Sequence, residues 1–348
     1  MSQCIPVIYS VTQGSGNDLG EASKLGEASA APPAGEEVIK REMSHRGGIN
    51  QGAEEVYEVR MQDLASGMTR PCAMLFVMGT RTCVPSDFAA DAMQPRPELL
   101  AACKELDASC ATPEEEAAGG VTQLRHLKVL DAVSSTATLG FRIDAAKTVI
   151  DGESLTLGNL PLPDGMNLAT LRDEKDVAKA IGIFVQSDPL ITKQAAIKID
   201  AIKAACERSM AKKEAGFMPR HALLRSSLLL VYDDAQREHV ELKVSPRTPP
   251  ATPSPTLTLS YALYQLGSTL HVADAACFDS PLATPQMINF GFSYRIPEEA
   301  PDLTHKATWS GKPEDNEDGY LVGVDNLTGV FRRLTDELSE VKTQLFRL

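Results

Sequence analysis

Short hydrophobic runs along this chain predict β-strands, and longer stretches with apolar residues three or four apart predict helices. The β-rich runs predict strands at 5–12, 38–41, 56–61, 71–79 and 287–292, and a run at 134–143 leads into another. Residues 223–232 are apolar almost throughout, which is typical of a central strand. Polar and apolar positions alternate over 256–273, where we expect a hairpin or an edge strand.

Helical periodicity marks two segments in the middle of the chain, 173–185 and 190–214. In the second segment the apolar positions, with lysines opposite, are Ile191, Ala195, Ile199, Ile202 and Cys206. From Leu327 onward one apolar stripe predicts an amphipathic helix that docks on the core, with Asp325 as its N-cap. The Ala-, Glu- and Pro-rich residues 84–120 predict helix followed by exposed loop.

Two segments have compositions unsuited to a packed core. Residues 13–36 are rich in Gly, Ala and Ser, and 246–256 form a Pro-rich run. Neither buries enough apolar surface to offset the entropy of ordering the chain. We expect a flexible loop in the first and a disordered connector in the second.

The composition is that of a soluble globular protein, with 43% hydrophobic and 23% charged residues among 348. The net charge of −13 argues against generic binding to nucleic acid or anionic membranes, which requires clustered basic residues. Seven scattered cysteines without a CxxC pair fit reduced thiols, so we expect a cytoplasmic or nuclear protein. No apolar run approaches the ~18 residues of a membrane span.

Six sequence blocks then point to a family. They are Met61-Gln-Asp-Leu64, Pro71–Arg81, Ser134–Ile143, Arg225–Asp233, Ile288-Asn-Phe290 and Asp318–Leu327. In this order they resemble the motifs of the inositol polyphosphate kinases, and Pro71–Arg81 is most similar to the signature Pro-x-x-x-Asp-x-Lys-x-Gly of the hexakisphosphate kinase branch.

The resemblance implies an α+β, two-lobed fold with ATP and Mg²⁺ as cofactors and an inositol phosphate as ligand. It places a reduced antiparallel N-lobe with the hinge at residues 1–70 and a larger C-lobe at 71–348. Residues 5–11 are similar to a family segment that follows the strand with an ATP-contacting lysine, so that lysine is expected to precede this chain.

The resemblance also assigns candidate site residues. ATP would contact Gln62, Asp63, Ser226 and Ser227. Arg81 and Lys128 would contact the substrate, although a solvated helix face also explains Lys128 and its basic neighbours Arg125 and His126.

Three departures fall where the family's chemistry resides. Leu75 and Val77 replace the signature Asp and Lys, and Asn289 replaces the Asp that binds Mg²⁺. Phosphoryl transfer requires a metal held by carboxylates and cations on the transferring group, which Leu and Val cannot supply. We therefore expect a catalytically impaired pseudokinase. Two alternatives remain open: an active kinase that uses Asp63, Asp233 or Lys40 instead, and a non-enzymatic scaffold that binds a partner.

Overall fold

A computed structural model describes residues 8–15, 36–41, 55–90, 92–150, 152–156, 160–163, 166–213, 216–236 and 283–345. The chain forms two compact units, Met1–Met68 and Thr69–Leu348, which we describe separately. The predicted connector at 246–256, the predicted hairpin at 256–273 and residues 16–35 of the predicted loop lie outside the described residues.

The first unit contains a three-stranded antiparallel sheet. Its strands β1 (Ile8–Ser15), β2 (Glu36–Arg41) and β3 (Glu55–Gln62) lie in the order β1-β3-β2. The strands predicted from the β-rich runs at 5–12, 38–41 and 56–61 are therefore confirmed. The predicted loop starts too early, because residues 13–15 continue β1 and pair with Tyr57, Val56 and Glu55 of β3. That ladder satisfies the backbone of a Gly-containing segment whose composition alone suggests a loop.

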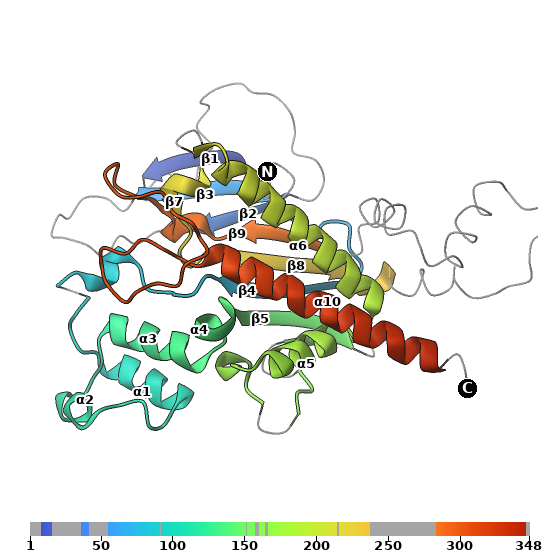
Figure 1. Cartoon of the computed structure of the whole chain (residues 1–348), viewed down its shortest axis with the longest axis horizontal. Helices are drawn as coiled ribbons and strands as arrows, with labels where there is room; N and C mark the ends of the chain where they lie inside the picture. The colour runs from blue at the N-terminus through green and yellow to red at the C-terminus, as the bar shows by residue number, and fades with distance from the viewer. Residues whose placement is uncertain are drawn as a thin grey trace, which may run out of the picture. The chain divides into compact units, whose positions relative to one another are not determined.

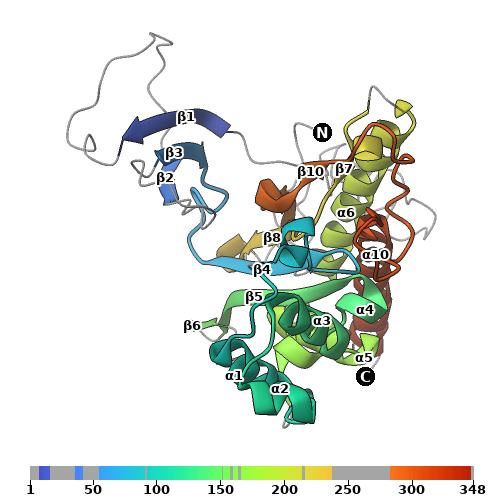
Figure 2. The ribbon, with the colours of Figure 1, turned by 90° about the vertical axis from the view of Figure 1, so that its left-hand side faces the viewer.

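The second unit is built on a five-stranded antiparallel sheet (Figures 1 and 2), so the class is α+β, as predicted. The order is β6-β5-β4-β8-β9. The strands are β4 (Pro71–Met78), β5 (Phe141–Ile150), β6 (Glu153–Thr156), β8 (Ser227–Asp233) and β9 (Ala283–Ile288). A separate ribbon pairs β7 (His221–Ala222) with β10 (Tyr294–Arg295).

Three helices cover one face of this sheet: α5 (Glu174–Phe184), α6 (Pro189–Met210) and α10 (Tyr320–Leu345). Edge-to-face ring pairs connect the layers, Phe76 of β4 with Phe331 of α10 and Phe184 of α5 with Tyr232 of β8. Alternate side chains of β4, from Cys72 to Met78, are buried in this core. The predictions of helix at 173–185 and 190–214 are confirmed, except that the second helix ends at Met210.

A group of smaller helices connects β4 to β5 along the chain. It comprises α1 (Pro97–Leu106), α2 (Pro113–Ala118), α3 (Gln123–Val133) and α4 (Thr136–Leu139). Thr112 and Glu115 cap α2 reciprocally, and Gly119 ends it at a φ of 67°. Among the described residues, no helix combines the length and apolarity needed to cross a bilayer.

Three further predicted boundaries are wrong. The strand expected from 223 starts only at Ser227, because Arg225 adopts a φ of 52° and Ser226 Oγ donates to the carbonyl of Leu223. The strand expected at 287–292 ends at Ile288, because Asn289 is left-handed with a φ of 60°.

The N-cap predicted at Asp325 is also wrong. Helix α10 starts at Tyr320, whose backbone N–H donates to Asp318 Oδ1 at 2.9 Å. Asp325 lies inside the helix and pairs with Lys203 at 2.5 Å. The helix extends further toward the N-terminus than its apolar stripe suggests.

Candidate functional site

Leu75 and Val77 lie on the face of β4 opposite the helical core. They alternate with the buried Met74 and Phe76, and Val77 is 8% exposed while Leu75 is half-buried. Across the ladder Leu75 is opposite Leu229. The face of the sheet around Leu75 is therefore lined by apolar side chains.

Val77 stands between two polar residues on the neighbouring strands. It is opposite Ser227 of β8 on one side and Arg142 of β5 on the other. Ser227 is in turn opposite Ile288, so Asn289 follows directly at the end of β9. Asn289 Nδ2 donates to Ser227 Oγ at 3.1 Å. The fold thus brings the predicted positions Val77, Ser227 and Asn289 together.

These side chains do not fit a Mg²⁺–nucleotide centre. Leu75 and Val77 carry no polar atoms, and the amide of Asn289 offers a neutral oxygen while its nitrogen is bonded to Ser227. Hard dications prefer carboxylate oxygens. Within the described part of the chain, no cluster of three or more His, Cys, Asp or Glu could hold a metal ion.

The positive charge of Arg142, the residue opposite Val77 on β5, is neutralised by two carboxylates. Arg142 lies 3.7 Å from Asp131 and 3.4 Å from Asp144, and its Nη1 donates to Thr82 Oγ1 at 3.0 Å. Asp131 also accepts from the backbone N–H of Thr82 at 2.8 Å. Burial raises the pKa of Asp131, although the Thr82 bonds and Arg142 oppose the rise. Our sequence reasoning missed Arg142, a charged residue between the apolar Phe141 and Ile143.

A second arginine near the site has a carboxylate partner. Arg225 Nη2 contacts Asp87 at 2.7 Å and its Nε donates to the carbonyl of Thr82 at 2.8 Å. The half-exposed ring of Phe292 lies over its guanidinium at 4.5 Å. These contacts hold the left-handed turn before β8 in place.

The two predicted substrate residues, Arg81 and Lys128, meet at one tryptophan. Arg81 Cζ lies 4.9 Å and Lys128 Nζ 5.5 Å from the centroid of the Trp309 ring. Arg81 is 2% exposed, whereas Lys128 is exposed on α3. Trp309 is not among the site residues that the sequence predicted. No local signal connects it to Arg81, because the contact is long-range.

The predicted nucleotide residues are distributed between the two units. In the first unit Gln62 ends β3, and Asp63 Oδ1 accepts from the backbone N–H of Ala65 at 2.9 Å. In the second unit Ser226 is 1% exposed and bonded to Leu223, on the turn before β8. Their roles in binding ATP stay predictions.

Asp233, one of the alternative catalytic carboxylates, accepts hydrogen bonds from backbone N–H groups. Its oxygens accept from the N–H groups of Thr69, Arg70 and Ala235 at 2.9 to 3.0 Å. Partial burial acts to raise its pKa, but these bonds outweigh it and the pKa is lowered. The side chain of Lys40 on β2, another alternative, lies outside the described residues.

Comparison with known proteins supports the family indicated by the motifs. The model of the family described as "Inositol polyphosphate kinase" matches residues 58–332. The chain is 26% identical to inositol-trisphosphate 3-kinase A of Rattus norvegicus over 280 residues, which cover 80% of this chain and 47% of that protein. It is 26% identical to inositol-trisphosphate 3-kinase C of Homo sapiens over 270 residues, 77% of this chain and 30% of that protein.

The chain thus spans about half or less of the length of these curated relatives. A solved structure of inositol phosphate multikinase Ipk2 of S. cerevisiae, in complex with ADP and Mn²⁺, aligns at 16% identity with a TM-score of 0.36, over 80% of this chain and 84% of that one. The family model covers most of the second unit and the end of the first. The chain belongs to the inositol polyphosphate kinase family.

Proposed function

We propose that this chain is a catalytically impaired family member, a pseudokinase that binds an inositol phosphate without transferring phosphate to it. The observation that carries the proposal is the placement of Val77 and Asn289 beside Ser227, with Leu75 two residues away on the same face of β4. Three positions where the family's motifs hold charged residues are neutral here, and two of them are apolar.

The expected loss is large. Removing a single electrostatic group that stabilises a transition state typically costs ~10²–10³ in rate. Groups that act as a unit are not additive, so the loss of several leaves little above background. Val77 is also buried, so water has little access to this position.

An active enzyme would need substitutes for these charges. Asp233 is a poor one, because it is opposite Pro71 whereas Val77 is opposite Ser227 at the other end of β4. At ~3.4 Å per residue the two positions are about 20 Å apart. Arg142 is neutralised by Asp131 and Asp144. Asp63 and Lys40 remain the substitutes to exclude by experiment.

Arg81 and Lys128 support the ligand class in this proposal. They place two positive charges at one tryptophan in a chain whose net charge is −13. The named relatives are trisphosphate 3-kinases, while the signature block is most similar to the hexakisphosphate kinases. Both the trisphosphate and the hexakisphosphate are therefore the ligands to test, with binding of ATP and Mg²⁺ weak or lost.

The test is a phosphoryl-transfer assay on the full chain with Mg²⁺–ATP and inositol tris- or hexakisphosphate. We expect no turnover above background. In the variant with Leu75→Asp, Val77→Lys and Asn289→Asp together, we expect tighter nucleotide binding by calorimetry. Wild-type turnover that Asp63→Ala or Lys40→Ala abolishes would refute the proposal. The matched control Lys212→Ala, at an exposed position just after α6, should change nothing.

A further inference from the structure

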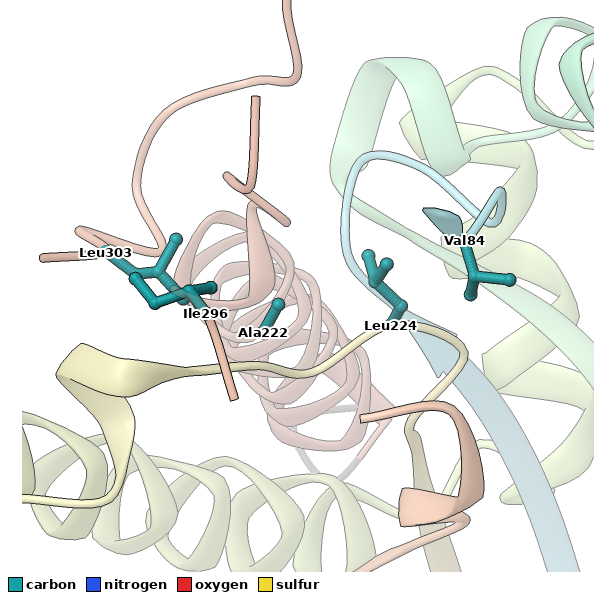
Figure 3. Close-up of a cluster of buried hydrophobic side chains, with 5 residues drawn as sticks. All are labelled: Val84, Ala222, Leu224, Ile296 and Leu303. Carbon is teal, nitrogen blue, oxygen red and sulfur yellow. The ribbon is translucent and has the colours of Figure 1, made fainter. Parts of the chain in front are cut away.

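Residues 306–317 form a loop, here called the strap, whose two ends are fixed in the protein interior. His305 and Asp318, both fully buried, flank it and are bonded to each other at 2.8 Å. Leu303, just before the strap, packs in a cluster with Ala222 and Ile296, which Figure 3 shows beside Leu224 and Val84. The strap itself is exposed over most of its length.

Trp309 is the strap residue that turns back onto the body of the protein. Its indole N–H donates to the carbonyl of Lys312 at 2.9 Å, which fixes the turn. Its ring meets Phe88 edge-on at 6.1 Å and lies over Arg81 and beside Lys128. The ring therefore covers Arg81, which is 2% exposed.

Arg81 differs from two other arginines near it, the buried Arg142 and the partly buried Arg225. Arg142 and Arg225 each contact a carboxylate within 4 Å, and both are hydrogen-bonded to Thr82. Arg81 forms no ion pair with any described residue, and its Nε and Nη2 are buried without a hydrogen-bond partner. Asp315 of the strap acts on it only through space. Tyr294 offers one hydrogen-bonding contact.

The position of the two unpartnered nitrogens is informative. Nε–H and one Nη2–H of a guanidinium point in the same direction and form the fork that binds two oxygens of a phosphate or carboxylate side by side. A buried guanidinium without an anion costs several kcal/mol. A cation–π contact such as that with Trp309 returns only about 0.5–2 kcal/mol. The structure therefore holds a guanidinium fork that lacks its anion.

We propose that Arg81 and Lys128 bind one phosphate group of a polyanionic ligand beneath the strap, and that Trp309 moves aside to admit it. This inference rests on the proposed function, because it assigns the same two residues to the ligand. It adds the mode of contact, a bidentate phosphate on Nε and Nη2 of Arg81, and a moving part. The exposed Lys128 supplies a second charge at the rim.

The single tryptophan of the chain makes the proposal directly testable. Titration of the full protein with inositol hexakisphosphate, followed by Trp309 fluorescence, should give a saturable change, and myo-inositol should give none. Arg81→Gln should weaken binding about tenfold or more, and Lys128→Gln by a smaller factor. An identical response in Arg81→Gln would overturn the proposal, as would calorimetric binding that leaves the fluorescence unchanged.

Stability supplies an independent readout. Arg81→Met removes an unpaired buried charge, so the melting temperature of the ligand-free protein should rise while the stabilisation by hexakisphosphate disappears. The matched control Arg225→Met leaves Asp87 without its partner and should lower the melting temperature. A lower melting temperature in Arg81→Met would show a structural arginine and would sink the idea. Arg81→Lys, which keeps the charge but loses the fork, should show intermediate affinity.

Failure here is separable from failure of the proposed function. Wild-type turnover would refute the pseudokinase while leaving phosphate binding at Arg81 intact. Loss of the Arg81 effect, with turnover still absent, would refute only this site.

Discussion

The imidazole of His305 and the carboxylate of Asp318 form a fully buried pair, with Nδ1 2.8 Å from Oδ1 and 2.9 Å from Oδ2. The other ring nitrogen, Nε2, lies 2.8 Å from the carbonyl oxygen of Met218. Both nitrogens face acceptors, so all of these contacts are satisfied as hydrogen bonds when both nitrogens carry protons, in the imidazolium form. Asp318 also accepts from the N–H groups of Leu223 and Tyr320, and the pair thereby fixes the start of α10.

The first prediction is a pH dependence of stability due to His305. Burial alone lowers its pKa, but the bond and charge of Asp318, the Met218 carbonyl and nearby Glu317 outweigh burial, and the pKa is raised above its usual value. The stabilisation is therefore fully present below the unfolded-state pKa of about 6.5 and is lost as pH rises through the folded-state value. Urea unfolding between about pH 5 and pH 9 should show this decline.

The control is His305→Asn, which tolerates the left-handed φ of 56° and removes the pair. We expect a loss of about 3 kcal/mol at low pH, shrinking as pH rises. The difference between wild type and variant is the quantity to follow, because His126 has a pKa lowered by burial and by Arg96 and titrates in the opposite sense. A difference independent of pH would contradict the imidazolium assignment.

The second prediction concerns Asp131, which accepts a hydrogen bond from Thr82 and pairs with Arg142. Asp131→Ala leaves a buried N–H and a buried guanidinium underpaired, so we expect a loss of about 3 kcal/mol in unfolding free energy. Asp131→Asn keeps an acceptor for Thr82 and should cost less, because burial already raises the pKa of this carboxyl and favours its neutral form. Equal losses in both variants, measured by urea unfolding, would contradict this ranking.

The sequence predicted those helices and strands that depend on the pattern of residues within the element itself. Strand β4 follows from a β-rich apolar run, and helices α5 and α6 follow from apolar residues that recur at helical spacing. The start of β8 depends instead on Arg225, whose turn is stabilised by Asp87 across the fold. The start of α10 likewise depends on Asp318 and its contact with His305. Long-range contacts of this kind leave no periodic trace in the sequence.

In the candidate site, too, some features follow from local patterns in the sequence and others depend on long-range contacts. The period of two in a strand places Leu75 and Val77 on one face, and the ladder confirms that placement. The bond between Asn289 and Ser227 follows from the pairing of β9 with β8, which the sequence does not encode locally. The stacking of Arg81 on Trp309 joins distant segments and was missed for the same reason.

The third prediction tests how far the site has adapted to its apolar residues. Val77→Lys places a cation in a nearly buried position directly opposite Arg142, so we expect a loss of about 2 kcal/mol. Adding Leu75→Asp two residues along the same face should recover part of it. Val77→Met is the apolar control and should cost less than Val77→Lys. Urea unfolding of all three variants decides, and a neutral Val77→Lys would mean that the position still accommodates the family's lysine.

The last prediction concerns three glycines of the family motifs, which this chain retains although the charged residues at positions 75, 77 and 289 are replaced. Gly79, Gly140 and Gly323 belong to three different motif blocks and meet at one point, where the N–H of Gly79 donates to the carbonyl of Gly140 at 2.8 Å. A Cβ on Gly323 would lie 2.0 Å from that same carbonyl oxygen, and Gly140 itself has a φ of 70°. Helix α10 can approach the end of β4 this closely only without side chains.

Gly323→Ala should therefore destabilise the protein by about 3 kcal/mol, although alanine is the better helix former. Gly329→Ala, less than two turns further along α10, is the matched control. There the nearest atom to a new Cβ is the flexible end of Arg333 at 3.4 Å, so we expect a gain of up to about 1 kcal/mol. Thermal and urea unfolding of the two variants measures the contrast. If both substitutions behave alike, close packing is not what preserves these glycines, and a remaining role in ligand binding would have to be sought for them.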